Sequence, residues 1–205
     1  MATHEYASSV FINCPFDKDY KDIFNAIVFA IFDCGYIPRC ALEFHDASLV
    51  RIDQIASMMS ECKFGIHDIS RTELNTEHNL PRFNMPLELG LFLGAKKFGP
   101  RKDKSKVCLI LDREKYRYQR FISNIAGQDI KSHNDDPYTA IPIIRDWLRN
   151  SSGRVTIPGG SDICSRYQLF TTELQDLCSN LKLETNELIF NDYALIVSEW
   201  LKKSP

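Results

Sequence analysis

The sequence predicts an α/β domain built on a doubly wound parallel sheet of about five strands. Short β-prone or apolar runs alternate with longer segments in which apolar residues recur at helical spacing. Short apolar strands of this kind are typical of parallel sheets that carry helices on both faces. After residue 111 helical segments dominate instead, which predicts a C-terminal helical extension. We therefore expect an α/β domain over residues 1–155 and a helical extension packed on it over residues 156–205.

The strands are expected where β-prone runs end at turn-forming residues. They cover Ser8–Cys14, Tyr36–Leu42, Lys63–Ile69 and Val107–Leu111, with a short fifth strand near Asp129-Ile130. Pro38 lies within the second of these runs and cannot donate a hydrogen bond to a neighbouring strand. The second strand is therefore expected at an edge of the sheet.

The helices are expected where apolar residues recur every three to four positions. They cover Lys18–Cys34, a segment capped by Ser48, a segment opening at Asn84, Tyr116–Ala126, Asp136–Asn150, Asp162–Leu181 and Glu187–Lys202. Pro158-Gly159-Gly160 marks a connector before the last two helices. The apolar stripes of those two helices suit packing on the core or on another subunit.

Composition and charge exclude several classes of protein. The 205 residues carry a net charge of −2, which gives no bulk electrostatic reason to bind nucleic acid or an anionic membrane. No apolar run approaches the ~20 residues that span a bilayer. Seven cysteines without a Cys-x-x-Cys pair, and a start that lacks signal-peptide features, predict a cytoplasmic protein with free thiols. The five histidines have no metal-ligand spacing, so no metal site is expected.

The most informative stretch of the chain runs from Asn84 to Ala95. Asn84 is a favourable N-cap residue, and Pro86 falls in the first turn, where a missing N–H costs no hydrogen bond. Glu88 is the one charge in an apolar run, so burial should raise its pKa while the helix N-terminus stabilises its charge. A capping-box glutamate would stand at residue 87 instead. Glu88 is therefore either an acid that favours the helix dipole or a functional carboxylate at the floor of a pocket.

Two further segments should converge on Glu88, because ligands of open parallel sheets bind beyond the carboxyl ends of the strands. The first contains Asn13, Pro15 and Phe16, and it is either a simple strand-to-helix turn or a substrate-facing loop. In the second reading Asn13 offers hydrogen bonds and Phe16 a stacking face. The second segment contains Asp68, which either satisfies backbone donors in a turn or orients a ribose hydroxyl.

Arg51 is a fourth candidate, in the first turn of its expected helix. A cation there opposes the helix dipole, so it is either a solvated surface residue or an anion clamp beside free N–H groups. The sequence contains no Gly-x-x-x-x-Gly-Lys-Ser/Thr loop, no Gly-x-Gly-x-x-Gly after a strand and no Gly-x-Ser-x-Gly elbow. These absences weigh against common NTPases, dehydrogenases and serine hydrolases.

Three stretches, taken in order and spacing, resemble the landmarks of a known group. They are Val10-Phe11-Ile12-Asn13-Cys14-Pro15-Phe16, Gly65-Ile66-His67-Asp68-Ile69-Ser70 and Asn84-Met85-Pro86-Leu87-Glu88-Leu89-Gly90. The chain resembles the nucleoside 2-deoxyribosyltransferase-like group and the allied bacterial TIR-like nucleotide-binding domains over residues 8–112. The resemblance implies a flavodoxin-like fold, a glutamate (Glu88) that acts on the anomeric carbon of a base–sugar bond, and a hydroxyl-orienting Asp68. Arg82 replaces the acid or serine that the transferases carry, whereas Asn84 fits the TIR-like pattern as a substrate-binding residue.

The resemblance thus implies a nucleotide N-glycosidase that cleaves the nicotinamide–ribose bond of NAD, with a role in bacterial antiphage defence. NAD or a related nucleotide is then the substrate, and no cofactor is expected. One alternative is a nucleoside or nucleoside-monophosphate N-glycosidase or 2-deoxyribosyltransferase. Another is a non-catalytic module that senses a nucleotide or mediates assembly. The expected partners are a nucleotide and further copies of the chain, as a homodimer or higher oligomer, without membrane or nucleic acid.

Overall fold

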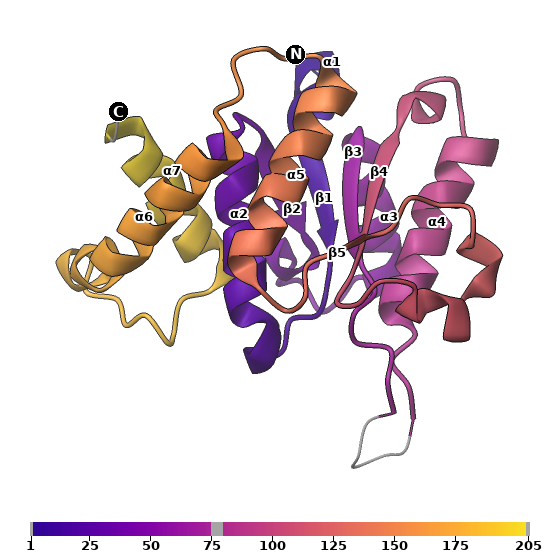
Figure 1. Cartoon of the computed structure of the whole chain (residues 1–205), viewed down its shortest axis with the longest axis horizontal. Helices are drawn as coiled ribbons and strands as arrows, with labels where there is room; N and C mark the ends of the chain where they lie inside the picture. The colour runs from indigo at the N-terminus through magenta and orange to yellow at the C-terminus, as the bar shows by residue number, and fades with distance from the viewer. Residues whose placement is uncertain (1, 75–79, 204–205) are drawn as a thin grey trace.

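A five-stranded parallel sheet forms the centre of the molecule (Figure 1). The computed structural model describes residues 2–74 and 80–203. The strands are β1 (Ser9–Asn13), β2 (Ile37–Cys40), β3 (Phe64–Asp68), β4 (Val107–Asp112) and β5 (Lys131–Ser132). Their order is β2-β1-β3-β4-β5, and all four pairings are parallel. This is the flavodoxin-like order, so the expected fold class is confirmed.

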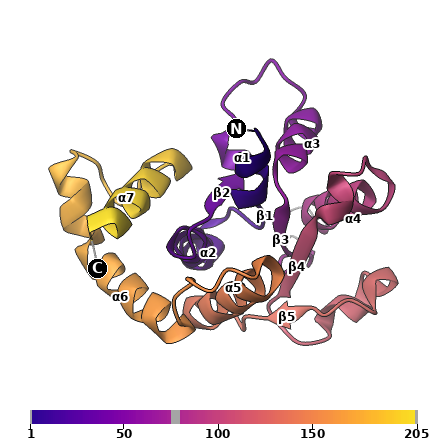
Figure 2. The same cartoon turned by 90° about the horizontal axis from the view of Figure 1, so that it is seen from above.

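Helices cover both faces of this sheet, as Figure 2 shows. The helices α2 (Lys21–Asp33) and α5 (Pro137–Ser152) pack against each other on one face, and α3 (Arg51–Glu61) and α4 (Asn84–Phe98) lie on the other. Shorter elements are α1 (Ala2–Ser8), η1 (Lys18–Tyr20), η2 (Ala41–Glu43), η3 (Asp103–Ser105), η4 (Arg117–Arg120) and η5 (Ser123–Ile125). Side chains alternate along β1: Val10 and Ile12 join one core cluster, whereas Phe11 joins the cluster under α3. This alternation explains why the strand is apolar throughout.

The C-terminal helices α6 (Gly160–Asn180) and α7 (Phe190–Lys203) extend the core on the α2 side. The ring of Phe29 on α2 contacts Phe170 and Trp200, with centroids 5.3 and 5.9 Å apart. Both rings are buried in the cluster that also contains residues of β1 and α5. The extension is therefore joined to the sheet domain by a continuous core.

Gly65 leaves room on β3 for the ring of Phe92, which belongs to α4. A Cβ atom at this position would stand 2.7 Å from the ring of Phe92 and 2.9 Å from His67 Nε2. The ring of Phe92 fills the space that any other residue on the strand would occupy, and it is fully buried. This contact sets the height of α4 above the sheet, and with it the position of Glu88.

Several element boundaries differ from the sequence-based expectations. Pro38 does stand in an edge strand, as expected. Ser48 does not cap a helix, because its N–H and hydroxyl bind the carboxylate of Asp46 and α3 begins only at Arg51. The helix expected over 116–126 is instead two short 3-10 turns that start after Tyr116, whose φ of 62° is left-handed. The fifth strand begins at Lys131 rather than near 129–130.

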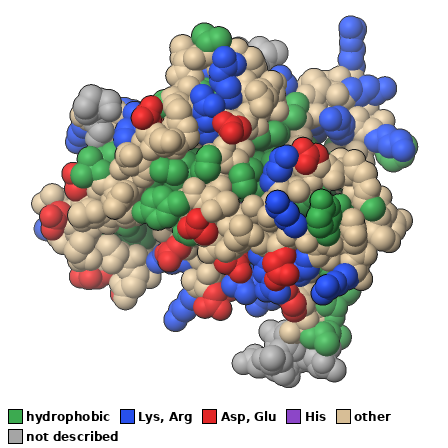
Figure 3. Space-filling view, viewed as in Figure 1, with side chains coloured by type: hydrophobic (Ala, Val, Ile, Leu, Met, Phe, Trp, Pro, Cys, Tyr) green, Lys and Arg blue, Asp and Glu red, His purple; other side chains and the backbone are tan. Residues whose placement is uncertain are grey.

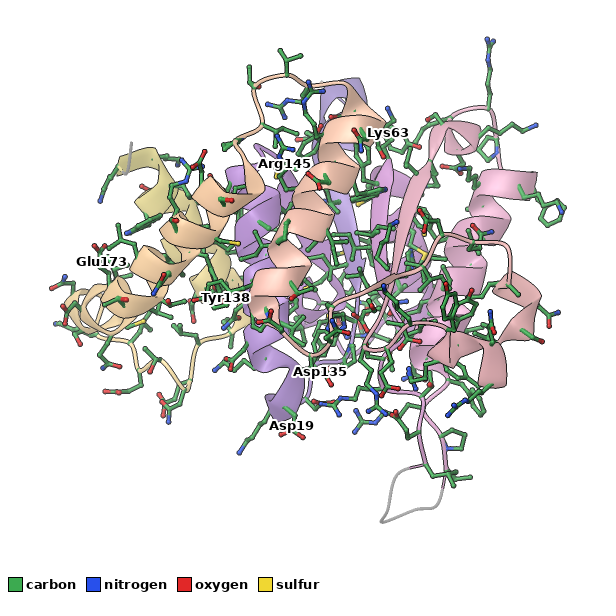
Figure 4. All side chains as sticks on the ribbon, viewed as in Figure 1. Asp19, Lys63, Asp135, Tyr138, Arg145 and Glu173 are labelled. Carbon is green, nitrogen blue, oxygen red and sulfur yellow. The ribbon has the colours of Figure 1, made fainter. Side chains whose placement is uncertain are left out.

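The carboxyl ends of the strands meet at the lower edge of the molecule in Figure 1. Asp19 in η1 and Asp135 after β5 both lie at this edge (Figure 4). Acidic and basic side chains are interleaved there in the space-filling view (Figure 3). Within the described ranges, no helix combines the length and apolar character needed to cross a bilayer.

Candidate functional site

A cleft of about 460 Å³ opens where the strand order reverses, between β1 and β3. Its walls are the segment after β1 and the first turns of α3 and α4. They comprise Asn13, Cys14, Pro15, Phe16, Asp17, Ala41, Arg51, Ile55, Arg82, Asn84, Met85 and Glu88. The volume falls in the usual range of small-molecule sites, ~300–1,000 Å³, and the location is the one that open α/β sheets use for ligands.

Glu88 lies in the second turn of α4 and lines this cleft. Loss of hydration raises the pKa of its carboxyl group to about 7, and the positive charge of Arg51 opposes this rise. No described residue forms a hydrogen bond or an ion pair with Glu88. A half-buried carboxylate whose lost hydration no described residue restores by a hydrogen bond is suited to meet a ligand.

Arg51 is the first residue of α3, and its guanidinium lies 5.9 Å from the ring of Phe44. It lines the same cleft as Glu88 and is exposed. A cation and free N–H groups are thus placed together at one helix end, which is an arrangement that suits a phosphate.

Asn13 ties the end of β1 to the start of α4. Its side-chain amide donates a 2.9 Å hydrogen bond to the carbonyl of Met85 and lies 3.1 Å from Nδ1 of His67. His67 is fully buried; desolvation, with a smaller effect of Lys106, lowers its pKa to about 3, so the ring is neutral. Neutral Nδ1 accepts the amide proton, and Asn13 is thereby fixed at the floor of the cleft.

The remaining expected ligand contacts lie at the rim. Pro15 is buried, whereas Phe16 keeps 41% of its surface exposed and meets Phe24 edge-on. Asn84 is exposed in the first turn of α4. Asn84 was expected to be the N-cap of this helix, but Phe83 holds that position. The N–H of Leu87 binds the carbonyl of Phe83. The asparagine side chain is thereby released from capping.

Asp68 does not join this cleft. Its carboxylate is fully buried and accepts hydrogen bonds from the hydroxyl of Tyr20 (2.7 Å) and the backbone N–H of Ser70 (2.8 Å). Nε2 of His133 lies 2.9 Å away and carries a proton, because Nδ1 of the same ring accepts from the N–H of Asp135. Burial alone would raise the pKa of Asp68, but the hydrogen bonds from His133, Ser70 and Tyr20 bring it below its ordinary value. The group joins the end of β3 to η1 and to the residue after β5, and it does not line the cleft.

The sequence did not predict two ion pairs in this region. Arg82 forms an ion pair with Asp17 (3.2 Å), which links the loop after β1 to the start of α4 across the rim. Arg117 is buried against Asp112 (2.7 Å) and donates to the carbonyl of Ile69. These pairs join residues 65 and 5 positions apart, and neither leaves a periodic signal in the sequence.

The chain matches no protein-family model, and neither a curated protein nor a solved structure is significantly similar to it. In the described part of the chain, no group of three or more His, Cys, Asp or Glu side chains is arranged to hold a metal ion.

Proposed function

We propose that this protein is a nucleotide N-glycosidase and that NAD is its leading substrate. The observation that carries the proposal is the state of Glu88: a desolvated carboxylate, without a described partner, in the cleft at the strand-order reversal. Cleavage of a base–sugar bond builds positive charge on the anomeric carbon of the ribose. A carboxylate held in a low-dielectric cleft stabilises that charge or attacks the carbon directly.

The other charges of the cleft favour a leaving group that needs no proton. Among the described residues, the carboxyl groups that line it are Asp17 and Glu88, and Asp17 is paired with Arg82. A glycosidase that protonates its leaving group needs a second, free carboxyl group. Nicotinamide leaves from a cationic ring and becomes neutral on departure, so it fits a site with a single acting carboxylate. This favours NAD over nucleosides and over deoxyribosyl transfer.

The test is base release from a panel of substrates. Purified protein is incubated with NAD, nicotinamide mononucleotide (NMN), AMP and adenosine, and free base is separated by chromatography. We expect nicotinamide from NAD and a loss of at least ~100-fold in Glu88→Gln, the usual scale for removing a group that stabilises transition-state charge. Glu199→Gln, at a half-exposed glutamate that pairs with Lys202 near the end of α7, is the control.

Other outcomes have distinct meanings. Base release from AMP or adenosine but not from NAD would favour an N-glycosidase that acts on nucleosides or nucleoside monophosphates. Nucleotide binding without any base release would favour a sensing module and would contradict the glycosidase. A role in antiphage defence follows from the resemblance alone, and plaque counts with wild-type and Glu88→Gln protein in a host cell test it.

The expected homodimer also remains a proposal, and the outer face of α4 supports it. This face carries Phe83, Leu87, Gly90, Leu91, Gly94 and Phe98, which fall within one narrow sector of the helix and include no charge. The four large side chains are exposed, Phe98 to 81%, and the space around both glycines is open. In an antiparallel pair centred between Gly90 and Leu91, Leu87 of one copy faces Gly94 of the other. Such self-complementarity is what a twofold interface requires.

One helix stripe offers less than the ~800 Å² per partner of a standard interface. We therefore expect a weak, concentration-dependent dimer. Light scattering on wild-type and Leu87→Arg protein tests this, with Leu169→Arg, an exposed leucine on α6, as control. A monomer at every concentration would contradict the proposed dimer and would leave the proposed glycosidase activity unaffected.

A further inference from the structure

A second hollow, of about 220 Å³, lies between the sheet domain and the C-terminal helices. Its walls are aromatic and aliphatic: Phe24 of α2, Phe190 and Tyr193 of α7, and Leu188 and Ile189 from the segment before α7. The volume is below the ~300–1,000 Å³ of complete small-molecule sites. It suits one flat ring system rather than a whole nucleotide.

This hollow is a neighbour of the Glu88 cleft. Pro15, Phe16 and Asp17 line both, so the loop after β1 forms a partition between them. The ring of Phe16 is 41% exposed on this partition and meets Phe24 edge-on, with centroids 5.4 Å apart. Phe24 in turn lies 6.0 Å from Phe190. A row of aromatic rings thus leads from the rim of the Glu88 cleft into the second hollow.

The charged side chains that line the two cavities are four cations and the two carboxylates Asp17 and Glu88. Lys18 and Lys21 line the second hollow, and Arg51 and Arg82 line the cleft. Asp17, on the partition itself, is neutralised by Arg82. Nζ of Lys21 donates to the carbonyl of Thr185 (3.3 Å) and so joins the hollow to its C-terminal wall. Cations on either side of the partition suit phosphate groups that cross it.

We propose that the second hollow binds the distal base of a dinucleotide whose other half lies at Glu88. The linking phosphates would cross the partition between the cations, and the distal base would pack against the aromatic wall. This inference rests on the proposed function and narrows its substrate class from nucleotides in general to dinucleotides. It also gives the α6–α7 pair a role in substrate selection.

The test compares NAD with NMN, which carries the same scissile bond but no distal base. Ile189→Trp and Thr185→Trp each place a large side chain on the wall of the second hollow, at positions that are not fully buried. We expect each to lower kcat/KM for NAD by ~10-fold or more, since loss of one stacked base has effects of this size. The fall should be confined to NAD. Leu195→Trp, an exposed leucine of α7 outside the hollow, is the matched control.

An equal fall for NAD and NMN in both variants, or no fall for NAD, would overturn the proposal. If wild-type protein releases base from neither substrate, the proposed function is wrong. The proposal that the second hollow binds a base is then tested by ligand binding alone. Calorimetry with ADP-ribose on wild-type and Ile189→Trp protein then provides the readout. Binding of ADP-ribose that is ~10-fold weaker in the variant would support the second site. Equal binding by the variant and wild-type protein, or no binding by wild-type protein, would overturn it.

Discussion

Glu88 and Asp68 are two carboxyl groups at the same edge of one sheet, and their surroundings give them opposite properties. Asp68 is fully buried, holds three hydrogen-bond donors and has a lowered pKa. Glu88 is half-buried, has no described partner and has a pKa raised to about 7. Burial alone therefore does not identify a functional acid. What separates the two is whether the protein itself compensates for the lost hydration.

The comparison predicts that removal of the two carboxyl groups has different effects on the stability of the fold. Asp68→Ala leaves the hydroxyl of Tyr20 without its acceptor in a dry site, and it leaves Nε2 of His133 with Ser70 Oγ (3.0 Å) in place of a carboxylate. We expect a loss of ~3–5 kcal/mol in the free energy of unfolding by urea, the scale for breaking a buried charged network. Glu88→Gln should not lower it at neutral pH, because the variant removes a half-buried charge whose lost hydration is not compensated. Equal losses of unfolding free energy in the two variants would contradict the difference between the two carboxyl groups.

A smaller effect is expected at Gly65, which sets the position of α4 and with it that of Glu88. Gly65→Ala drives a methyl group into Phe92 and should destabilise the fold by ~1–3 kcal/mol, as overpacking does. Gly90→Ala, on the open face of α4, is the control and should stabilise by ~0.5–1 kcal/mol through helix propensity. A neutral Gly65→Ala would mean that α4 can move freely above the sheet.

The pH dependence of stability should also differ in sign. Because the folded pKa of Glu88 is about 7 and its ordinary value is 4.5, the native state binds more protons between these values. Glu88 therefore lowers stability as pH rises from about 4.5 to about 7. Asp68, with a lowered pKa, contributes stability above its ordinary value of 3.8 that is lost as pH falls further. Urea midpoints of wild-type and Glu88→Gln protein across this range measure the first effect, and parallel curves would contradict it.

The smallest effect is expected at Arg51, which is exposed and screened by solvent. Arg51→Ala should weaken binding of NMN by up to ~10-fold and binding of nicotinamide riboside, which lacks the phosphate, by less than ~2-fold. Arg120→Ala, an exposed arginine in η4, is the control. Calorimetry on both ligands distinguishes the two roles, and equal effects would make Arg51 a surface residue.

The sheet was predictable because its signals are local. Pro38 alone places the second strand at an edge, and the isolated charge of Glu88 marks the cleft. The environment of Asp68 was not predictable, because Tyr20 and His133 reach it from 48 residues before and 65 residues after it. The helix expected after Tyr116 fails for a similar reason: buried Arg117 and the left-handed backbone of Tyr116 fix that segment by tertiary contacts.

The pH profile of base release tests the central claim most directly. If the ionised Glu88 performs the chemistry, kcat/KM for NAD rises with pH through about 7 and then levels off. In Glu88→Gln the profile should be flat and at least ~100-fold lower. A wild-type profile that is flat through this range, or a Glu88→Gln protein with comparable activity, would contradict the assignment of this cleft as the functional site.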